Sequence, residues 1–383
     1  MPWKETNVVE QKIRFVIRAV EGGEKVSPLC REFGISRPTA YRWINRYKDA
    51  GSIESLLERS RRPLSSPRRT PARIERQVVD LRLRYGWGAK KLAVLLRDEG
   101  TQLSVPTINR IIRRNGLLPR RDCQGLAVER FERAAPNELW QVDFKGPVLL
   151  QEGRCHPLSM IDDHSRFAVG LFPLTNQRTK PVTACFARAF EKYGVPEAIL
   201  MDHGVPWWAT TSGSGLTRLS VYLIKQGIRL HHGRYYHPQT QGKVERFHRT
   251  LSQYMAHHGA PTRFAEMSDY LGKFRTEYNE LRPHEALRMG VPKDHYQPSA
   301  QPFNPQPPEW EYEDGLSLKR LNKVGSIRLG GKTYFISEAL AGDTVAIEPL
   351  CDTILVKYRH MYIRELDIKT GRSRPLVLPV SLP

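Results

Sequence analysis

The sequence predicts a multidomain protein with two all-α units, an α/β region with a mixed sheet, and a small C-terminal β-barrel. Residues 1–121 carry amphipathic helical patterns, residues 138–300 alternate strand and helix patterns, and residues 313–378 hold short, regularly spaced strand patterns with glycine turns. The length of 383 residues allows several domains. With 40% hydrophobic and 26% charged residues, most of the chain is expected to fold.

The composition argues against a membrane or a secreted protein. The apolar runs are too short to span a bilayer, and the N-terminal segment MPWKETNVVEQK lacks the apolar core of a secretory signal. We therefore expect a soluble, cytoplasmic protein. The five cysteines stand singly, which argues against a disulfide framework and a structural zinc site.

The charge of the chain points to a polyanionic partner. The net charge is +20, and residues 1–121 hold 27 Lys and Arg against 12 Asp and Glu. Such a basic N-terminal third indicates nucleic-acid contact there.

Residues 1–60 are expected to form a helix-turn-helix domain. Apolar residues from Val9 to Val20 follow a helical stripe, and Ser27 is expected to cap a short second helix. Gly34 is expected to form a tight turn before a third helix, which Ser36 caps. The second helix of a helix-turn-helix motif lies in the major groove. The predicted DNA contacts on it are Arg37, Thr39, Arg42 and Arg46. The alternative is a plain three-helix bundle with solvated arginines.

Residues 74–121 repeat this pattern as a second helix-turn-helix domain. Helical patterns cover residues 74–84 and 88–100, and Ser104 caps a third helix that carries the predicted DNA contacts Arg110, Arg113 and Arg114. Residues 61–73 form a Pro, Ser and Arg-rich linker whose arginines could follow phosphates or enter a minor groove: Arg61, Arg62, Arg68 and Arg69. A plain solvated linker is the alternative. Residues 122–137 form a second linker.

From residue 138 to residue 300 the pattern is that of an α/β domain. The segment LWQVDFKGPV predicts a strand, residues 156–174 a hairpin, TKPVTACFARAFEKYG a helix, and VPEAILMDHG a strand that ends at Asp202. A long helix is expected over residues 237–258, and another over residues 264–281.

Three carboxylates stand at unusual places in this domain. Asp143 interrupts an apolar strand, Asp202 ends a buried strand, and Glu245 lies one step off the apolar stripe of the long helix. Burying an acid is costly unless it is paired or binds a metal. Three acids brought together would repel, and Mg²⁺ or Mn²⁺ would relieve that repulsion. Two such ions about 3.5–4 Å apart can activate an attacking oxygen and stabilise the leaving oxygen of a phosphodiester.

Asp162 and Asp163 are a rival pair of carboxylates. In the segment IDDHSR they stand at the expected bend of a hairpin, close to Arg166. We therefore favour a turn or ion-pair role for them.

The motifs LWQVDFKG, IDDHSRF, AILMDHG, HGRYYHPQTQGKVERFHRTL and NELRPHEAL together resemble the DDE transposases and integrases with a ribonuclease-H-like core. The resemblance is closest to bacterial insertion-sequence transposases with N-terminal helix-turn-helix units. It implies that Asp143, Asp202 and Glu245 are the catalytic, metal-binding triad, and that Lys243, Arg246 and Arg249 contact the transposon-end DNA. The 42 residues between Asp202 and Glu245 exceed the spacing in many members of the family, and the surplus is expected in the loop WWATTSGSGLTRLS.

The resemblance also implies a function and partners. The protein would bind the ends of its mobile element, release a 3′-hydroxyl by metal-dependent hydrolysis, and join it to target DNA without a covalent enzyme intermediate. It would act on double-stranded DNA in the bacterial nucleoid as at least a dimer. A non-catalytic DNA-binding regulator derived from a transposase, and a ribonuclease H acting on hybrids, are the alternatives.

A Pro-rich linker over residues 301–312 precedes the expected small barrel of residues 313–378. The barrel carries basic residues that could bind DNA: Arg328, Lys332, Lys357, Arg359 and Arg364. It is either a solvated appendage or, as its place after a DDE core suggests by resemblance, a module that bridges DNA.

Overall fold

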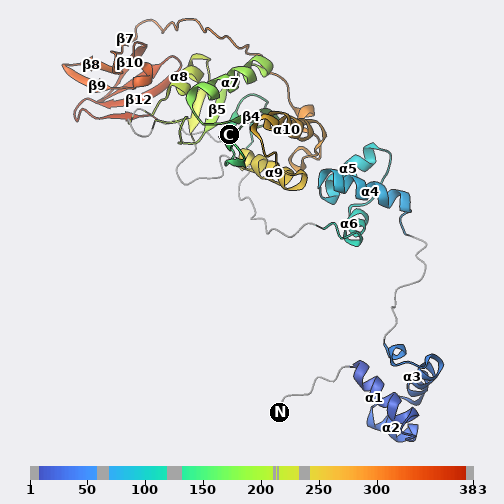
Figure 1. Cartoon of the computed structure of the whole chain (residues 1–383). Coiled ribbons are helices and arrows are strands. Elements are labelled where there is room, and N and C mark those ends of the chain that lie inside the picture. The colour runs from blue at the N-terminus through green and yellow to red at the C-terminus, as the bar shows by residue number, and fades with distance from the viewer. Residues whose placement is uncertain are drawn as a thin grey trace. The chain divides into compact units, whose positions relative to one another are not determined.

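The computed structural model describes residues 8–57, 69–118, 132–209, 213, 215–232 and 242–376. The chain divides into two compact units, residues 1–70 and residues 71–383 (Figure 1). Each unit is described by itself. Among the described residues, no helix has the length and apolar character needed to cross a membrane.

The N-terminal unit is a small helical domain made of α1 (Val8–Val20), α2 (Val26–Glu32), α3 (Arg37–Ala50) and the 3₁₀ turn η1 (Ile53–Leu56). Gly34 has a φ of 63°, which allows the tight turn between α2 and α3. Ser36 caps α3 by accepting a hydrogen bond from the Thr39 amide, as predicted. The prediction for Ser27 is wrong. Ser27 lies inside α2, behind the N-cap Lys25, and its hydroxyl accepts a hydrogen bond from Arg37.

The second unit begins with another trio of helices, α4 (Ala72–Tyr85), α5 (Ala89–Asp98) and α6 (Val105–Arg114). Ser104 caps α6 by accepting from the Thr107 amide, again as predicted. Their apolar stripes meet in one buried cluster that includes Val78, Leu92 and Ile108. The helical N-terminal region of the sequence prediction is thus confirmed.

A six-stranded mixed sheet forms the centre of the α/β region. Its order is β2 (Val148–Leu150), β3 (Gly153–Asp162), β1 (Trp140–Phe144), β5 (Ala198–Met201) and β6 (Arg229–His232), and β4 (Ala168–Leu174) also pairs with β3. Strand β1 is antiparallel to β3 and parallel to β5, and β5 is parallel to β6.

Helices cover the two faces of this sheet (Figure 1). Helices α7 (Thr179–Tyr193) and α8 (Arg218–Lys225) pack on one apolar cluster, which contains Trp140 and Val142 of β1. A second cluster joins β3 and β4 to α9 (Gly242–His258) and α10 (Phe264–Thr276). Helix α10 continues as a π-helical turn (Glu277–Leu281), and 3₁₀ turns follow at Glu285–Leu287 and Pro292–His295.

The C-terminal strands form an open sheet and a hairpin. The sheet is antiparallel and has the order β13 (Ser373–Pro375), β12 (Met361–Asp367), β11 (Thr353–Tyr358), β10 (Thr344–Leu350) and β7 (Ser317–Arg320). A hairpin of β8 (Ser326–Leu329) and β9 (Lys332–Phe335) and the 3₁₀ turn η6 (Glu338–Leu340) complete it. The expected β-barrel is not shown, because β13 and β7 lie at opposite edges of the described sheet and do not pair with each other. Regular strand spacing predicts the strands but not whether their edges meet.

The C-terminal sheet packs against the α/β domain. Its buried residues, among them Leu321, Tyr334 and Leu366, belong to the same apolar cluster as Trp140. Arg359 donates hydrogen bonds to the carbonyls of Lys225 and Pro308, both at 3.0 Å. Part of the segment expected as a Pro-rich linker therefore lies against folded structure.

Candidate functional site

Asp143 lies on the face of β1 that α9 covers. Side chains alternate along a strand, so Gln141 and Asp143 point away from the cluster that holds Trp140 and Val142. The Asp143 Oδ1 accepts a hydrogen bond from the Phe144 amide at 2.8 Å, and Nδ1 of His248 on α9 lies 3.8 Å from Oδ2. Burial lowers the pKa of His248 to about 4, so this imidazole is neutral at pH 7.

Asp202 directly follows β5, the parallel neighbour of β1. The register pairs Gln141 with Leu200, and Asp143 and Asp202 each stand two residues further along their chains. The Asp202 Oδ1 accepts from the Gly204 amide at 3.0 Å, and its backbone carbonyl accepts from His232 Nδ1 at 3.1 Å. A Cβ on Gly204 would lie 3.0 Å from Asp202 Oδ2, so a glycine allows this tight loop.

Glu245 lies in the first turn of α9 and is exposed. Its charge reaches Asp143. Burial raises the pKa of Asp143 to about 7, the Phe144 amide opposes this, and the charges of Asp202 and Glu245 raise it further. The structure thus brings the three predicted acids into one electrostatic neighbourhood.

Among the described residues, these three acids have no charged basic side chain paired with them. In the described part of the chain, no lysine or arginine forms an ion pair with Asp143, Asp202 or Glu245. Their oxygens are the donors that Mg²⁺ and Mn²⁺ prefer, so the donor chemistry fits these ions. Among the described residues, however, no three or more His, Cys, Asp or Glu side chains are grouped so that they could hold a metal ion.

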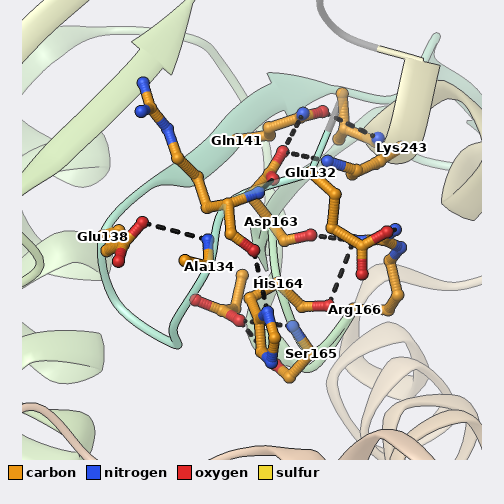
Figure 2. A network of polar contacts seen from close by, with 12 residues as sticks. Glu132, Ala134, Glu138, Gln141, Asp163, His164, Ser165, Arg166 and Lys243 are labelled. Atoms are coloured by element: carbon orange, nitrogen blue, oxygen red, sulfur yellow. Dashed lines mark hydrogen bonds and ion pairs between the residues drawn. The ribbon is translucent and has the colours of Figure 1, made fainter. Parts of the chain in front are cut away.

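Asp162 and Asp163 have a different environment, since both are fully buried and surrounded by donors. Asp162 accepts from the Asn137 amide and from the amide and hydroxyl of Ser165, at 2.6–2.8 Å. Asp163 pairs with Lys243 at 2.5 Å (Figure 2). These contacts agree with the turn and ion-pair role that the sequence favours for the two aspartates.

The predicted contacts on α9 divide into an internal and an external group. Lys243 faces inward, with 14% of its side chain exposed, and burial lowers its pKa to about 8 while the Asp163 charge opposes this. Arg246 and Arg249 are exposed and available to DNA. The segment 233–241 before α9, which carries part of the motif, lies outside the described residues.

Two of the predicted contacts in the first helix-turn-helix domain, Arg42 and Arg46, lie near one indole ring. Arg37 and Arg42 are exposed on α3, and Thr39 contributes to the N-cap. Arg46 is half-buried and donates to the Leu57 carbonyl at 2.8 Å. Lys12, Arg42 and Arg46 lie 4.2, 5.8 and 5.1 Å from the Trp43 ring.

In the second domain, Arg110 and Arg113 are exposed on α6, whereas Arg114 forms an ion pair with Glu75 at 2.7 Å. Of the linker arginines, Arg69 is exposed, and Arg61, Arg62 and Arg68 lie outside the described residues.

The basic residues of the C-terminal sheet point largely inward. Arg359 and Arg364 are buried, and Lys357 has 18% of its side chain exposed beside Glu313 and Glu348. Arg328 and Lys332 remain exposed. The basic surface expected on this module is therefore smaller than its composition indicates.

Sequence reasoning missed Gln141 and the strand β6. Gln141 is 1% exposed and hydrogen-bonds to Asp163 and to the Val244 amide of α9. A polar residue two positions before Asp143 in an apolar strand was the available signal. His232 is buried at the end of β6, a strand for which the sequence pattern gave no prediction.

Comparison with known proteins identifies domains that match this geometry. An integrase core domain matches residues 133–238 and another residues 226–292. A helix-turn-helix domain matches residues 11–63, and a homeodomain-like domain residues 39–112.

Two of the relatives come from insertion elements. An uncharacterized 31.7 kDa protein of insertion element IS407 from Burkholderia multivorans is 28% identical over 238 residues, which cover 57% of this chain and 81% of that protein. A protein assigned by name as a transposase of insertion sequence element IS5376, from Geobacillus stearothermophilus, is 24% identical over 375 residues. These residues cover 92% of this chain and 86% of that protein. Among solved structures, the simian T-cell lymphotropic virus intasome is 14% identical, with a TM-score of 0.37, and covers 79% of this chain and 99% of that one.

These matches define a protein with an integrase core behind helix-turn-helix domains, and such domains imply DNA binding. The chain is similar to proteins of insertion sequences, among them one named as a transposase, in agreement with the resemblance of its motifs.

Proposed function

We propose that this protein binds the ends of its own mobile element and performs metal-dependent DNA cleavage and strand transfer with Asp143, Asp202 and Glu245. One observation carries the proposal. Burial raises the pKa of Asp143 on β1, and Asp202 at the end of β5 and Glu245 on α9 lie close enough to raise it further. No lysine or arginine among the described residues pairs with these three acids. Perturbed carboxylates of this kind are typical of functional sites.

Asp143, Asp202 and Glu245 would hold Mg²⁺ or Mn²⁺, with two ions as the expected number. Bound ions would supply activation of the attacking oxygen and stabilisation of the leaving oxygen of the phosphodiester. The backbone amides of Phe144 and Gly204 hold one oxygen of Asp143 and of Asp202, which orients each carboxylate. His232, hydrogen-bonded to the Asp202 carbonyl, holds the loop that follows β5. These contacts fix ligand directions before DNA arrives.

The helix-turn-helix domains would provide recognition of the element ends. Exposed Arg42 on α3 and exposed Arg110 and Arg113 on α6 are available to base edges or phosphates. Because residues 1–121 hold 27 basic against 12 acidic residues, this third of the chain also favours DNA without regard to sequence. Two ends must be joined to one target, so we infer at least a dimer in the assembled complex.

A joining assay tests this function. The full-length protein would be incubated with the DNA that flanks its own coding sequence, a plasmid target and Mg²⁺, and the joined product measured. Asp143→Asn, Asp202→Asn and Glu245→Gln should bind the ends and fail to join them. Asp269→Asn is the matched control, because Asp269 is an exposed carboxylate of α10 with 72% of its side chain accessible.

Each alternative function has its own result in this assay. A chain that binds the ends but neither cuts nor joins them with Mg²⁺ or Mn²⁺ would be a DNA-binding regulator. Cleavage of RNA in RNA–DNA hybrids without joining would indicate a ribonuclease H.

A further inference from the structure

Asp163 is the centre of a polar network that joins three parts of the α/β domain (Figure 2). Its carboxylate is fully buried at the turn between β3 and β4. Oδ1 accepts from the Gln141 side chain of β1 at 2.8 Å and pairs with the Lys243 ammonium of α9 at 2.5 Å, and Oδ2 accepts from the Arg133 amide at 2.9 Å. A buried carboxylate with three charged or polar partners is fixed in position.

The turn that carries Asp163 is itself held firmly. The Asp163 amide donates to the Leu139 carbonyl at 2.9 Å. Arg166, which has 9% of its side chain exposed, donates to the Asp163 carbonyl and pairs with Glu132 at 3.0 Å (Figure 2). The turn is therefore held by contacts in addition to those with α9.

Gln141 links this turn to the start of α9. Its Nε2 donates to Asp163, and its Oε1 accepts from the Val244 amide at 3.2 Å. The first four amides of a helix have no partner inside the helix. Gln141 thus caps α9 from a neighbouring strand, and it does so on the same face of β1 as Asp143, two residues away.

Lys243 supplies the second link between α9 and Asp163. A cation in the first turn of a helix is unfavourable, because that end of the helix carries the positive end of the dipole. The Asp163 carboxylate offsets this cost at 2.5 Å, in a place where only 14% of the lysine side chain is exposed. Removing one partner would leave an uncompensated buried charge.

We propose that Asp163, Gln141 and Lys243 form a clamp that fixes the first turn of α9 on β1 and thereby places Glu245 relative to Asp143. Lys243 and Val244, which the clamp holds, directly precede Glu245. The three are positioning residues for the strand-transfer reaction, so the clamp rests on the proposed function. On this account Lys243 acts inside the protein and not on the transposon-end DNA.

A double-mutant cycle on the full-length protein tests the clamp. Asp163→Asn, Lys243→Met and the double variant would be compared with the wild type for single-end binding, for the rate of strand transfer with Mg²⁺ and for unfolding. Misplacement of a reacting group by about 1 Å can cost about 10²-fold in rate. We expect a loss of that order in each single variant with end binding unchanged, and no further loss in the double variant, because both changes open the same clamp.

Asp162→Asn is the matched control, since it removes the adjacent, equally buried carboxylate, which hydrogen-bonds to Asn137 and Ser165 and not to α9. It should lower stability without slowing joining per folded molecule. Hydrogen–deuterium exchange should rise at the start of α9 in Asp163→Asn and in Lys243→Met, and stay as in the wild type there in Asp162→Asn. If Asp163→Asn does not fold, Lys243→Met alone decides by the same two measurements.

Three results would overturn the clamp: wild-type joining by folded Asp163→Asn or Lys243→Met, multiplied losses in the double variant, or loss of end binding in Lys243→Met, which would assign the lysine to DNA. Failure of the proposed function looks different. The wild type itself would then join no DNA, while exchange at the start of α9 would still report whether the clamp exists.

Discussion

Two groups of carboxylates in one domain show how differently the same side chain can be used. Asp162 and Asp163 are buried, and each accepts from several donors. Asp143 accepts from one backbone amide and shares its surroundings with two other acids. Burial raises the pKa of Asp162 as it raises that of Asp143, so a raised pKa does not separate the groups. The two groups differ in the number of hydrogen-bond donors around each carboxylate.

The difference has an energetic meaning. A carboxylate whose oxygens are filled by donors stabilises the fold and has no capacity left for a ligand. Acids that lie close together without a cation repel one another, and a divalent ion would relieve this repulsion. We therefore expect substitutions in the first group to change the stability of the fold, and substitutions in the second group to change the rate of the reaction.

Removal of divalent cations should have the largest effect. Chelation should abolish cleavage and joining, because the repulsion among Asp143, Asp202 and Glu245 would remain uncompensated, and Mg²⁺ should restore both. Binding of single ends should persist, since it depends on the helix-turn-helix domains. Joining measured in EDTA and after adding back Mg²⁺ checks this, and full joining in EDTA would contradict it.

Asp162→Asn should lower the stability of the protein and leave joining intact. Loss of charge and of one acceptor among its contacts with Asn137 and Ser165 is expected to lower the free energy of unfolding by about 2–3 kcal/mol. Joining per folded molecule should be unchanged. Urea unfolding beside the joining assay measures both, and a selective loss of joining would show that this carboxylate takes part in the chemistry.

Arg42→Ala and Arg113→Ala should weaken recognition of the ends without altering joining once DNA is bound. If these side chains contact bases, each should lose about 1–3 kcal/mol of discrimination between end and random DNA. Competition binding at fixed salt checks this. Equal loss on both DNAs would make the contacts phosphate contacts.

Lys225→Ala should have the smallest effect. Its ion pair with Asp343 of the C-terminal module, at 3.3 Å, is about one-third exposed on both sides and should contribute about 0–1 kcal/mol to stability. Arg359→Ala removes two hydrogen bonds from a buried side chain and should cost more, about 1–3 kcal/mol. Thermal unfolding of both variants compares them, and an equal shift would show that burial of this contact does not matter.

The sequence predicts most elements of this fold because each carries a local signal. The stripes of α4 and α6, the caps Ser36 and Ser104, and the strand before Asp202 are examples. The prediction that Ser27 caps the second helix failed because a serine can also lie inside the first turn of a helix. The barrel failed because closure depends on pairing between distant edges.

The site divides in the same way. Asp143, Asp202 and Glu245 are conspicuous in the sequence, because an acid in or beside an apolar strand or stripe needs a reason. The sequence does not reveal that Lys243 and Arg364 point inward, because a lysine or arginine is expected at the surface until its partner is known. Asp163 lies 80 residues before Lys243, and only the folded sheet brings them together.

The most direct measurement compares the rate of joining per folded molecule in Asp143→Asn and Asp162→Asn, side by side, with the same element ends and Mg²⁺. The account predicts a loss of at least about 10²–10³-fold in Asp143→Asn, the range seen when one electrostatic group is removed from a preorganised site, at nearly wild-type stability. It predicts reduced stability and wild-type joining in Asp162→Asn. Wild-type joining by Asp143→Asn would contradict the assignment of the catalytic acids.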